Sequence, residues 1–370
     1  MPRPSPPITR ETTRSNPCFN PLLDAVELLP SAAAAAAAVP SFTAAHSTFR
    51  QHVRAFVREH LTAAVVEAAE AAGRAPAALL RASYAAGLFA LRAPVSLGGT
   101  PPAGTTGGQF DLLFDVLLVS ELSRCGAMGL VTELMGSFGM LLPLLQAFGG
   151  AELQPLMQQM VRADKFICLA VSEPPLPPTR QGKAPPRRPG LRTTATLTAD
   201  GSSYEVSGEK IYISFALRAD FILTAVQLLP SASATATTDS TAAASYASSS
   251  SPPPALSLLL IPRSATGVRV EAMQMSGWRS TSTARITFSS VRVPASALLV
   301  DGSGERGSGV PRQLGLLMRA NVTRERFITG VMAAACARVC LDDAIEFARN
   351  KVLPGPVSYT HLTLPTKRIV

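Results

Sequence analysis

The hydrophobic period of this chain changes twice along its length, and this change constrains the fold more than any other feature. Between residues 41 and 162, apolar residues recur at helical spacing, as Phe49 and Val53 do, which is typical of amphipathic helices. Residues 163–300 instead alternate in short runs separated by Gly and Pro, which is typical of strands. The helical period returns over 310–352. This order predicts the α+β class: an N-terminal helical domain, a middle antiparallel β-barrel or sandwich, and a C-terminal helical domain.

Four segments flank or interrupt these predicted domains. Residues 1–40 form a low-complexity tail with an alanine run, and residues 353–370 follow the point where the last helical period ends. Two insertions divide the middle domain: 174–190 is rich in Pro and Arg, and 231–254 is rich in Ser, Ala and Thr. Segments of such composition cannot bury enough apolar area to order themselves. We therefore expect both insertions to be disordered loops.

The net charge of +9 invites comparison with nucleic-acid-binding proteins, in which clustered Lys and Arg neutralise phosphates. The densest basic group consists of Arg180, Lys183, Arg187 and Arg188, and it lies in a proline-rich segment without aromatic residues. This favours a solvated loop, so we expect no nucleic-acid partner. No uncharged apolar run reaches the ~20 residues that a spanning helix needs, so we also expect no membrane span.

The cysteines and histidines offer little material for a metal site or a disulfide framework. The five cysteines show no CxxC spacing, and the chain has only four histidines. Such cysteines are typical of buried thiols in a reducing compartment. We expect an intracellular protein of the cytoplasm or the mitochondrial matrix, without a metal. The Arg, Ser and Thr of the N-terminal tail are typical of a transit peptide, whereas Glu11, Asp24 and Glu27 are not, so the organelle stays open.

Three short segments follow one another in the middle of the chain, at 166–174, 208–214 and 277–288. A fourth, 324–326, opens the last helical stretch. In their order and spacing these segments resemble the acyl-CoA dehydrogenase family of flavoenzymes, over roughly residues 41–351. The resemblance implies an FAD-dependent oxidoreductase that removes an α-proton and a β-hydride from an acyl-CoA thioester, as in β-oxidation of fatty or branched-chain acyl groups.

The resemblance implies five flavin-contacting residues. Ser172 takes the place of the hydroxyl residue that hydrogen-bonds the flavin, and Tyr212 takes the aromatic position that stacks against the isoalloxazine. Leu169, Val171 and Ser214 take neighbouring positions. Taken without the flanking motifs, Tyr212 is more typical of a strand residue in a core.

The segment around 321–327 resembles the part of the family that faces the acyl-CoA. By this match Thr323 and Arg326 bind the substrate, and Glu325 is a candidate for the catalytic base, although most members take the base from a later C-terminal loop. The alternative for Arg324 and Glu325 is a solvated charge cluster at a helix start. We interpret Trp278 and Arg279 as structural residues of a turn.

The chain departs from the family pattern in two places. After Pro174 it continues with prolines, which offer no amide donor to a cofactor, where the family has small residues. Residues 353–370 match no part of the family, so we expect a C-terminally truncated chain with an incomplete four-helix bundle. The apolar face over 327–347 would then lack its partners, which predicts aggregation.

The resemblance also implies partners. We expect an electron-transfer flavoprotein as the electron acceptor, and a homodimer or homotetramer for the full-length protein. Two alternatives stay open: an acyl-CoA oxidase-like flavoenzyme that is reoxidised by O₂, and a non-catalytic scaffold of the same fold. The sequence does not indicate the acyl chain length.

Overall fold

The computed structural model describes residues 42–88, 91, 93–101, 112–136, 141–148, 150–175, 191–229, 256–299 and 310–351. The tails predicted over 1–40 and 353–370, the second insertion, and all of the first insertion after Pro175 lie outside these residues. Helices come first, strands follow, and one long helix closes the described chain. The predicted α+β class is therefore confirmed.

The N-terminal helices pack around two apolar cores: the helices within residues 44–135 share one, and those within residues 141–161 share the other with strands of the sheet. On α3, Phe49, Val53 and Phe56 are buried on a single face, as their spacing predicted. The helical period over 126–148 predicts one helix, whereas the structure has two, and residues 137–140 between them are outside the described part. The α-helices of this part are α3 (Ala44–His60), α4 (Ala63–Ala72), α5 (Ala77–Ala85), α6 (Leu112–Leu122), α7 (Met128–Met135), α8 (Leu141–Phe148) and α9 (Gln154–Val161).

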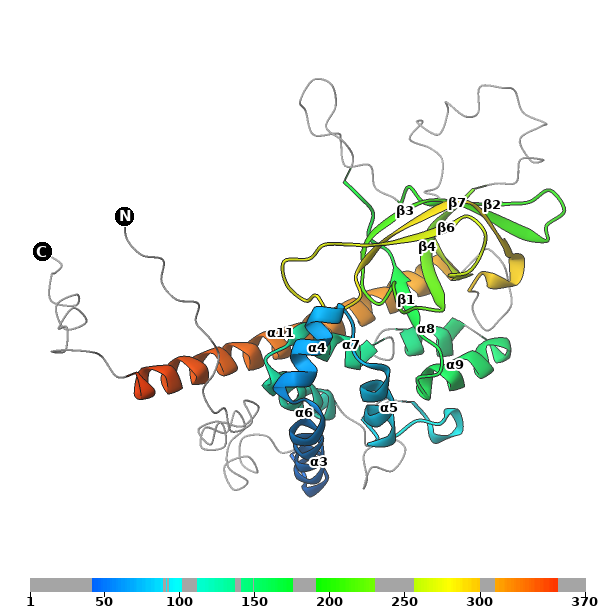
Figure 1. The fold of residues 1–370 in the computed structure, drawn as a ribbon. Helices are drawn as coiled ribbons and strands as arrows, with labels where there is room; N and C mark the ends of the chain where they lie inside the picture. The colour runs from blue at the N-terminus through cyan, green and yellow to red at the C-terminus, as the bar shows by residue number, and fades with distance from the viewer. Residues whose placement is uncertain are drawn as a thin grey trace, which may run out of the picture.

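The middle of the chain forms one curled sheet (Figure 1). Its order is β1-β4-β2-β3-β7-β6, and β5 pairs with β4. The strands are β1 (Ile167–Ala170), β2 (Thr194–Leu197), β3 (Ser203–Ile213), β4 (Phe221–Leu229), β5 (Leu256–Pro262), β6 (Val268–Ala272) and β7 (Ala284–Pro294).

The sheet is mixed, whereas the alternating pattern predicted an antiparallel one. Strands β1 and β2 both run parallel to β4, β1 beside residues 221–224 and β2 beside residues 227–229. The other pairs are antiparallel. Two short strands thus share one long strand, and the chain leaves the sheet between them, directly after Ala170. That exit is where the first candidate motif lies.

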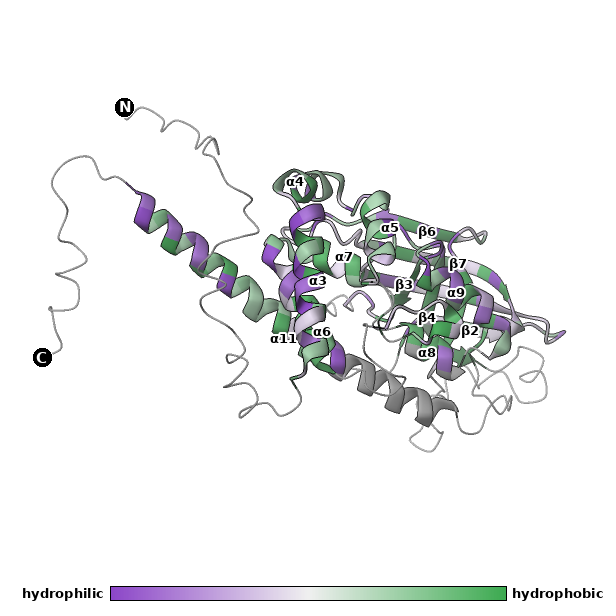
Figure 2. Cartoon of the chain, turned by 90° about the horizontal axis from the view of Figure 1, so that it is seen from below, coloured by the Kyte–Doolittle hydropathy of each residue, from purple (hydrophilic) through white to green (hydrophobic). Residues whose placement is uncertain are grey.

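The long helix α11 (Val310–Asn350) runs along the junction of sheet and helices and then projects away from them (Figure 1). Ile328 and Met332 are buried in the core of the N-terminal helices. Phe327, Leu341 and Phe347 are exposed, and apolar residues are visible along the projecting part of α11 in Figure 2. The predicted apolar face of this helix is therefore uncovered in the single chain.

A buried ion pair joins the N-terminal helices to the sheet. The Nε of Arg218, just before β4, lies 2.7 Å from the Oε1 of Glu133 on α7, whose side chain is 0% exposed. The Ser282 hydroxyl also donates to Glu133, and Arg218 donates to the Ala75 carbonyl. Close packing accompanies the pair: a Cβ on Gly129 of α7 would lie 2.9 Å from the Cα of Trp278. The two layers therefore have a fixed relative position around the cavity described next.

Candidate functional site

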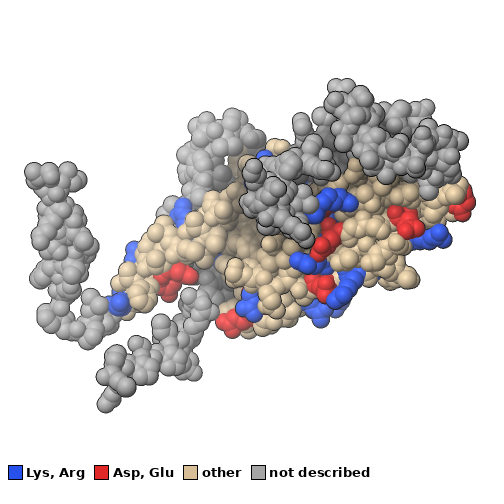
Figure 3. All heavy atoms as spheres, turned by 90° about the horizontal axis from the view of Figure 1, so that it is seen from above, with Lys and Arg blue, Asp and Glu red and all other residues tan. Residues whose placement is uncertain are grey.

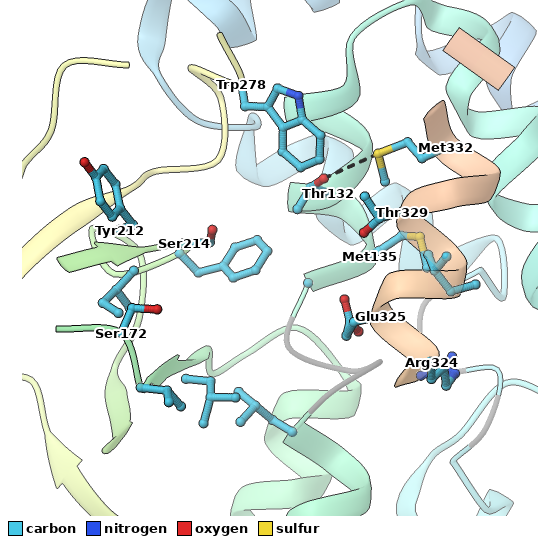
Figure 4. A pocket seen from close by; sticks show the side chains of 17 residues that line it. Thr132, Met135, Ser172, Tyr212, Ser214, Trp278, Arg324, Glu325, Thr329 and Met332 are labelled. Carbon is cyan, nitrogen blue, oxygen red and sulfur yellow. Dashed lines mark hydrogen bonds between the residues drawn. The ribbon is translucent and has the colours of Figure 1, made fainter. Parts of the chain in front are cut away.

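A cavity of about 460 Å³ lies where the end of β1, the end of β3 and the buried part of α11 meet (Figure 4). This volume is in the range of small-molecule and cofactor sites. Most of its lining is apolar, with a few hydroxyl and charged groups among the side chains. The lining residues are Thr132, Met135, Gly136, Leu141, Leu169, Val171, Ser172, Tyr212, Ile213, Ser214, Phe215, Trp278, Arg324, Glu325, Ile328, Thr329 and Met332.

The sheet side of the cavity carries hydroxyl groups and an aromatic ring. Ser172 and Tyr212 extend from neighbouring segments, because the Ile211 amide donates to the Ser172 carbonyl over 3.0 Å. Within the described residues no hydrogen bond is recorded for the hydroxyls of Ser172 and Ser214, so both can donate to a ligand. Tyr212 is 59% exposed, which differs from the core strand residue that its local sequence favours.

Unusual backbone conformations gather at this side of the cavity. Tyr212, Phe215 and Trp278 have φ values of 58°, 64° and 55°, in the left-handed region that residues with a Cβ rarely adopt. The pairing of β3 with β7 shifts register between Lys210 and Ile213, so a bulge turns Tyr212 outward. Such conformations cost on the order of 1–3 kcal/mol each and gather at binding sites.

The helix side of the cavity carries Glu325, Thr329 and Met332, about one residue per turn of α11 (Figure 4). Next to Glu325, the Nη2 of Arg324 lies 3.0 Å from the Oδ2 of Asp115 on α6, and that carboxylate is almost fully buried. The alternative of a solvated charge cluster is therefore wrong for Arg324, which is paired, and for Glu325, which faces the cavity.

The surroundings of Glu325 change its acidity. Burial raises the pKa of Glu325 above its usual range, the Arg324 charge acts against this rise, and the Asp115 carboxylate adds to it. A carboxylate with a raised pKa in a cavity is a candidate proton acceptor, because the pKa of an effective general base lies near the working pH.

The structure brings most of the predicted site residues together. Leu169, Val171, Ser172, Tyr212 and Ser214 line one cavity with Glu325. Thr323 and Arg326 are exposed, and neither is among the lining residues, so their substrate-binding role stays a prediction.

The sequence analysis missed other groups at the cavity. Trp278, interpreted as a structural residue, lines the cavity and is partly exposed. Thr329 could have been predicted as a cavity residue, because it lies four residues after Glu325 and hence on the same helix face. The partner of Arg324, Asp115, lies more than two hundred positions earlier, and no local pattern indicates it.

Comparison with known proteins shows which family the chain is similar to. A sequence model described as "Acyl-CoA dehydrogenase, N-terminal domain" matches residues 43–162. Acyl-CoA dehydrogenase AFT10-1 of Alternaria alternata is 24% identical over 344 residues, which are 88% of this chain and 68% of that protein. The chain spans about two thirds of the length of the curated relatives that it matches.

Solved structures show the same fold. The structure of a probable acyl-CoA dehydrogenase from Mycobacterium abscessus matches with a TM-score of 0.65 and 25% identity, over 88% of this chain and 75% of that one. A glutaryl-CoA dehydrogenase from Mycobacterium smegmatis in complex with FADH₂ matches with a TM-score of 0.63 and 18% identity, over 88% and 71% of the two chains. Residues 43–162 thus match the N-terminal domain of acyl-CoA dehydrogenases, and the curated and solved-structure neighbours of the whole chain are acyl-CoA dehydrogenases, the family that the four motifs predicted.

Three further features bear on the kind of site. Within the described residues, none of the helices combines the length and apolar character that crossing a bilayer requires. The same residues hold no group of three His, Cys, Asp or Glu side chains arranged to bind a metal ion. On the face drawn in Figure 3, Lys and Arg are interspersed with Asp and Glu and form no patch of one sign.

Proposed function

We propose that this chain is an FAD-dependent acyl-CoA dehydrogenase, with the flavin and the reacting acyl group in the cavity between β3 and α11. The observation that supports this most strongly is the shared cavity of Ser172, Tyr212 and Glu325. These three side chains come from different motifs far apart in the sequence. A pocket that combines ring-binding groups on one wall with a carboxylate on the other suits proton removal beside a bound flavin.

The residues present fit a flavin. The cavity is large enough for a ring system, its walls are mostly apolar, and the hydroxyls of Ser172 and Ser214 are available as donors. Ser172 and Ser214 would hydrogen-bond the ring system, and Tyr212 would pack against it, beside Leu169 and Val171. When bound, FAD supplies the hydride acceptor that no side chain can provide.

Glu325 is the proposed general base. Its carboxylate oxygen takes the α-proton of the acyl thioester and holds it on Oε while the β-hydrogen leaves. The apolar residues Met135, Leu141 and Ile328 line the same space and would exclude water from the acyl chain. Thr323 and Arg326, at the exposed side of α11, would contact the coenzyme A part.

Asp115 should set the pH dependence of this proton transfer. The reaction needs ionised Glu325, so its rate rises as the pH passes upward through the pKa of that carboxyl. Replacing Asp115 with Asn removes a negative charge that raises this pKa. The acid limb of the rate profile is therefore expected to move to lower pH. Rapid-mixing measurements of flavin reduction between pH 5 and 9 check this; a limb that stays in place or moves upward contradicts it.

The apolar lining suits a fatty or branched-chain acyl group, and we propose β-oxidation-type substrates of that class. By analogy with the family, an electron-transfer flavoprotein would accept the electrons, and a homodimer or homotetramer would be the full-length assembly. The exposed apolar residues of α11 support an assembly, since they need cover. We propose the cytoplasm or the mitochondrial matrix as its location.

Anaerobic mixing with a panel of acyl-CoAs tests the proposal. The FAD-loaded protein is expected to lose its visible flavin absorbance with one class of chain length and to form the matching enoyl-CoA. Admission of air separates two outcomes: rapid reoxidation with release of hydrogen peroxide identifies an oxidase, whereas slow reoxidation identifies a dehydrogenase. A loaded protein whose absorbance is unchanged by every acyl-CoA contradicts the proposal.

A further inference from the structure

A further buried ion pair lies beside the sheet wall of the cavity. The Nζ of Lys210 on β3 is 2.9 Å from the Oε1 of Glu173, and the Lys210 side chain is 0% exposed. Neither residue lines the cavity. Glu173 directly follows Ser172, which lines the cavity, and Lys210 lies two residues before Tyr212, at the start of the bulge.

Both carboxylate oxygens of Glu173 accept hydrogen bonds. Its Oε1 accepts from Lys210, from the Thr193 amide at 2.9 Å and from the Thr193 hydroxyl at 2.7 Å. Its Oε2 accepts from the Arg192 amide at 2.8 Å. These donors hold the pKa of Glu173 at about 2, although burial acts in the opposite direction. The carboxylate is therefore charged, and its bonds fix its position.

A glycine permits this arrangement. A Cβ on Gly208 would lie 2.6 Å from the Cα of Thr193, a distance that real Cβ atoms do not reach. Only glycine at this position lets the segment before β2 lie close enough to β3 for Thr193 to reach Glu173. Gly208 is the first residue of the motif 208–214. The contact that it permits holds Glu173, which belongs to the motif 166–174.

Stability alone does not explain the pair. Other buried positions of β3, such as Val206 and Ile213, are apolar, and an apolar side chain at 210 would avoid the desolvation of a charge. A buried pair of this kind instead fixes geometry, because each of its hydrogen bonds forms only when the donor and acceptor atoms have a defined relative position. The partner positions here belong to the segment that carries Ser172.

We propose that Glu173 and Lys210 are positioning residues for the flavin site, which hold the segment 171–173 against β3 and so set Ser172 beside Tyr212. Lys210 Nζ donates to the Val171 carbonyl at 3.2 Å, the Ile211 amide donates to the Ser172 carbonyl at 3.0 Å, and Glu173 binds Lys210 itself. Three consecutive residues are thus attached to two consecutive residues of β3, at the point where the chain leaves β1. The inference rests on the proposed function, because Ser172 and Tyr212 are the proposed flavin contacts.

The test uses the variants Glu173→Gln and Lys210→Met in the full chain. FAD affinity, measured by titration of flavin fluorescence, is expected to fall about 10- to 100-fold, as when groups that orient the ligands of a bound group are removed. In the FAD-free protein the Ile211 amide is expected to exchange its hydrogen at least about tenfold faster, because its acceptor is no longer held in place. That amide reports the contact directly, without flavin and without activity.

Two further variants separate positioning from stability. Each single change leaves one buried charge unpaired, so the double variant with Glu173→Gln and Lys210→Met is expected to recover thermal stability but not FAD affinity. The matched control is Glu209→Gln, on the same strand as Lys210, which removes a half-exposed carboxylate that pairs with Arg285 on β7. It is expected to leave both the FAD affinity and the Ile211 exchange rate unchanged.

The outcomes are distinct. Weaker FAD binding with faster Ile211 exchange in both single variants, and neither change in the control, supports the inference. Unchanged Ile211 exchange, or FAD affinity within about twofold of the parent chain, overturns it. If the parent chain takes up no FAD, the proposed function fails, and Ile211 exchange in the variants still decides whether the pair holds the segment.

Discussion

Replacing Glu325 with Gln is expected to slow the anaerobic reduction of bound flavin by acyl-CoA about 10²- to 10⁴-fold, the range typical for loss of a positioned base. Gln has nearly the same shape, so it keeps the cavity while removing the group that accepts the α-proton. FAD affinity should stay the same, because the proposed flavin contacts lie on the opposite wall. Rapid-mixing absorbance measurements at the flavin band give the rate.

The control for this change lies further along the same helix. Glu346 on α11 is exposed, so Glu346→Gln alters the net charge equally without touching the cavity and is expected to leave the rate unchanged. A Glu325→Gln protein that reduces its flavin at the parent rate would show that Glu325 is not the base. The base would then lie elsewhere, as in the family members that take it from a later loop.

Replacing Arg218 with Met is expected to destabilise the chain by about 3–5 kcal/mol, the range for removing one partner of a buried ion pair. The Glu133 carboxylate, with its 0% exposed side chain, would lose its guanidinium partner. Because the pair joins α7 to the sheet, the cavity between these layers is expected to lose FAD affinity as well. Urea unfolding followed by circular dichroism gives the free energy of unfolding.

Two comparisons make this result specific. Adding Glu133→Gln to Arg218→Met removes the unpaired charge and is expected to restore much of the lost stability. Replacing Arg285, whose pair with Glu209 is half-exposed, should change the free energy of unfolding by less than about 1 kcal/mol, as for other surface pairs. Equal losses for Arg218→Met and Arg285→Met would contradict the interpretation that the buried pair joins the two layers.

The order of helices and strands was predictable because periodicity is a local property. The alternation over 268–272 predicts strand β6 at its observed range, and the helical period over 111–122 predicts α6 one residue longer than observed. The pairing of the strands was harder to predict from the sequence. The two parallel pairs on β4 depend on which segments meet in space. The alternation predicts two separate runs, over 203–207 and 211–214, whereas β3 is continuous over Ser203–Ile213. Gly208 lies in that predicted gap, where it allows a close approach and does not end the strand.

The site was predictable where a residue type belonged to a motif, and not where its role depends on a distant partner. Ser172, Tyr212 and Glu325 were candidates because of their motifs, and they share a cavity. Lys210 was not a candidate, since lysine in a strand is usually solvated, and only the position of Glu173 explains its burial. Asp115 was missed for the same reason, because its partner Arg324 is on another helix.

Titration of FAD into the purified, flavin-free chain tests the central claim most directly. If the cavity between β3 and α11 is a flavin site, uptake saturates at about one FAD per chain, and a bulky Ser214→Trp variant, which fills the space beside Tyr212, abolishes it. A chain that folds but takes up no FAD contradicts the account. So does saturable uptake that Ser214→Trp leaves unchanged.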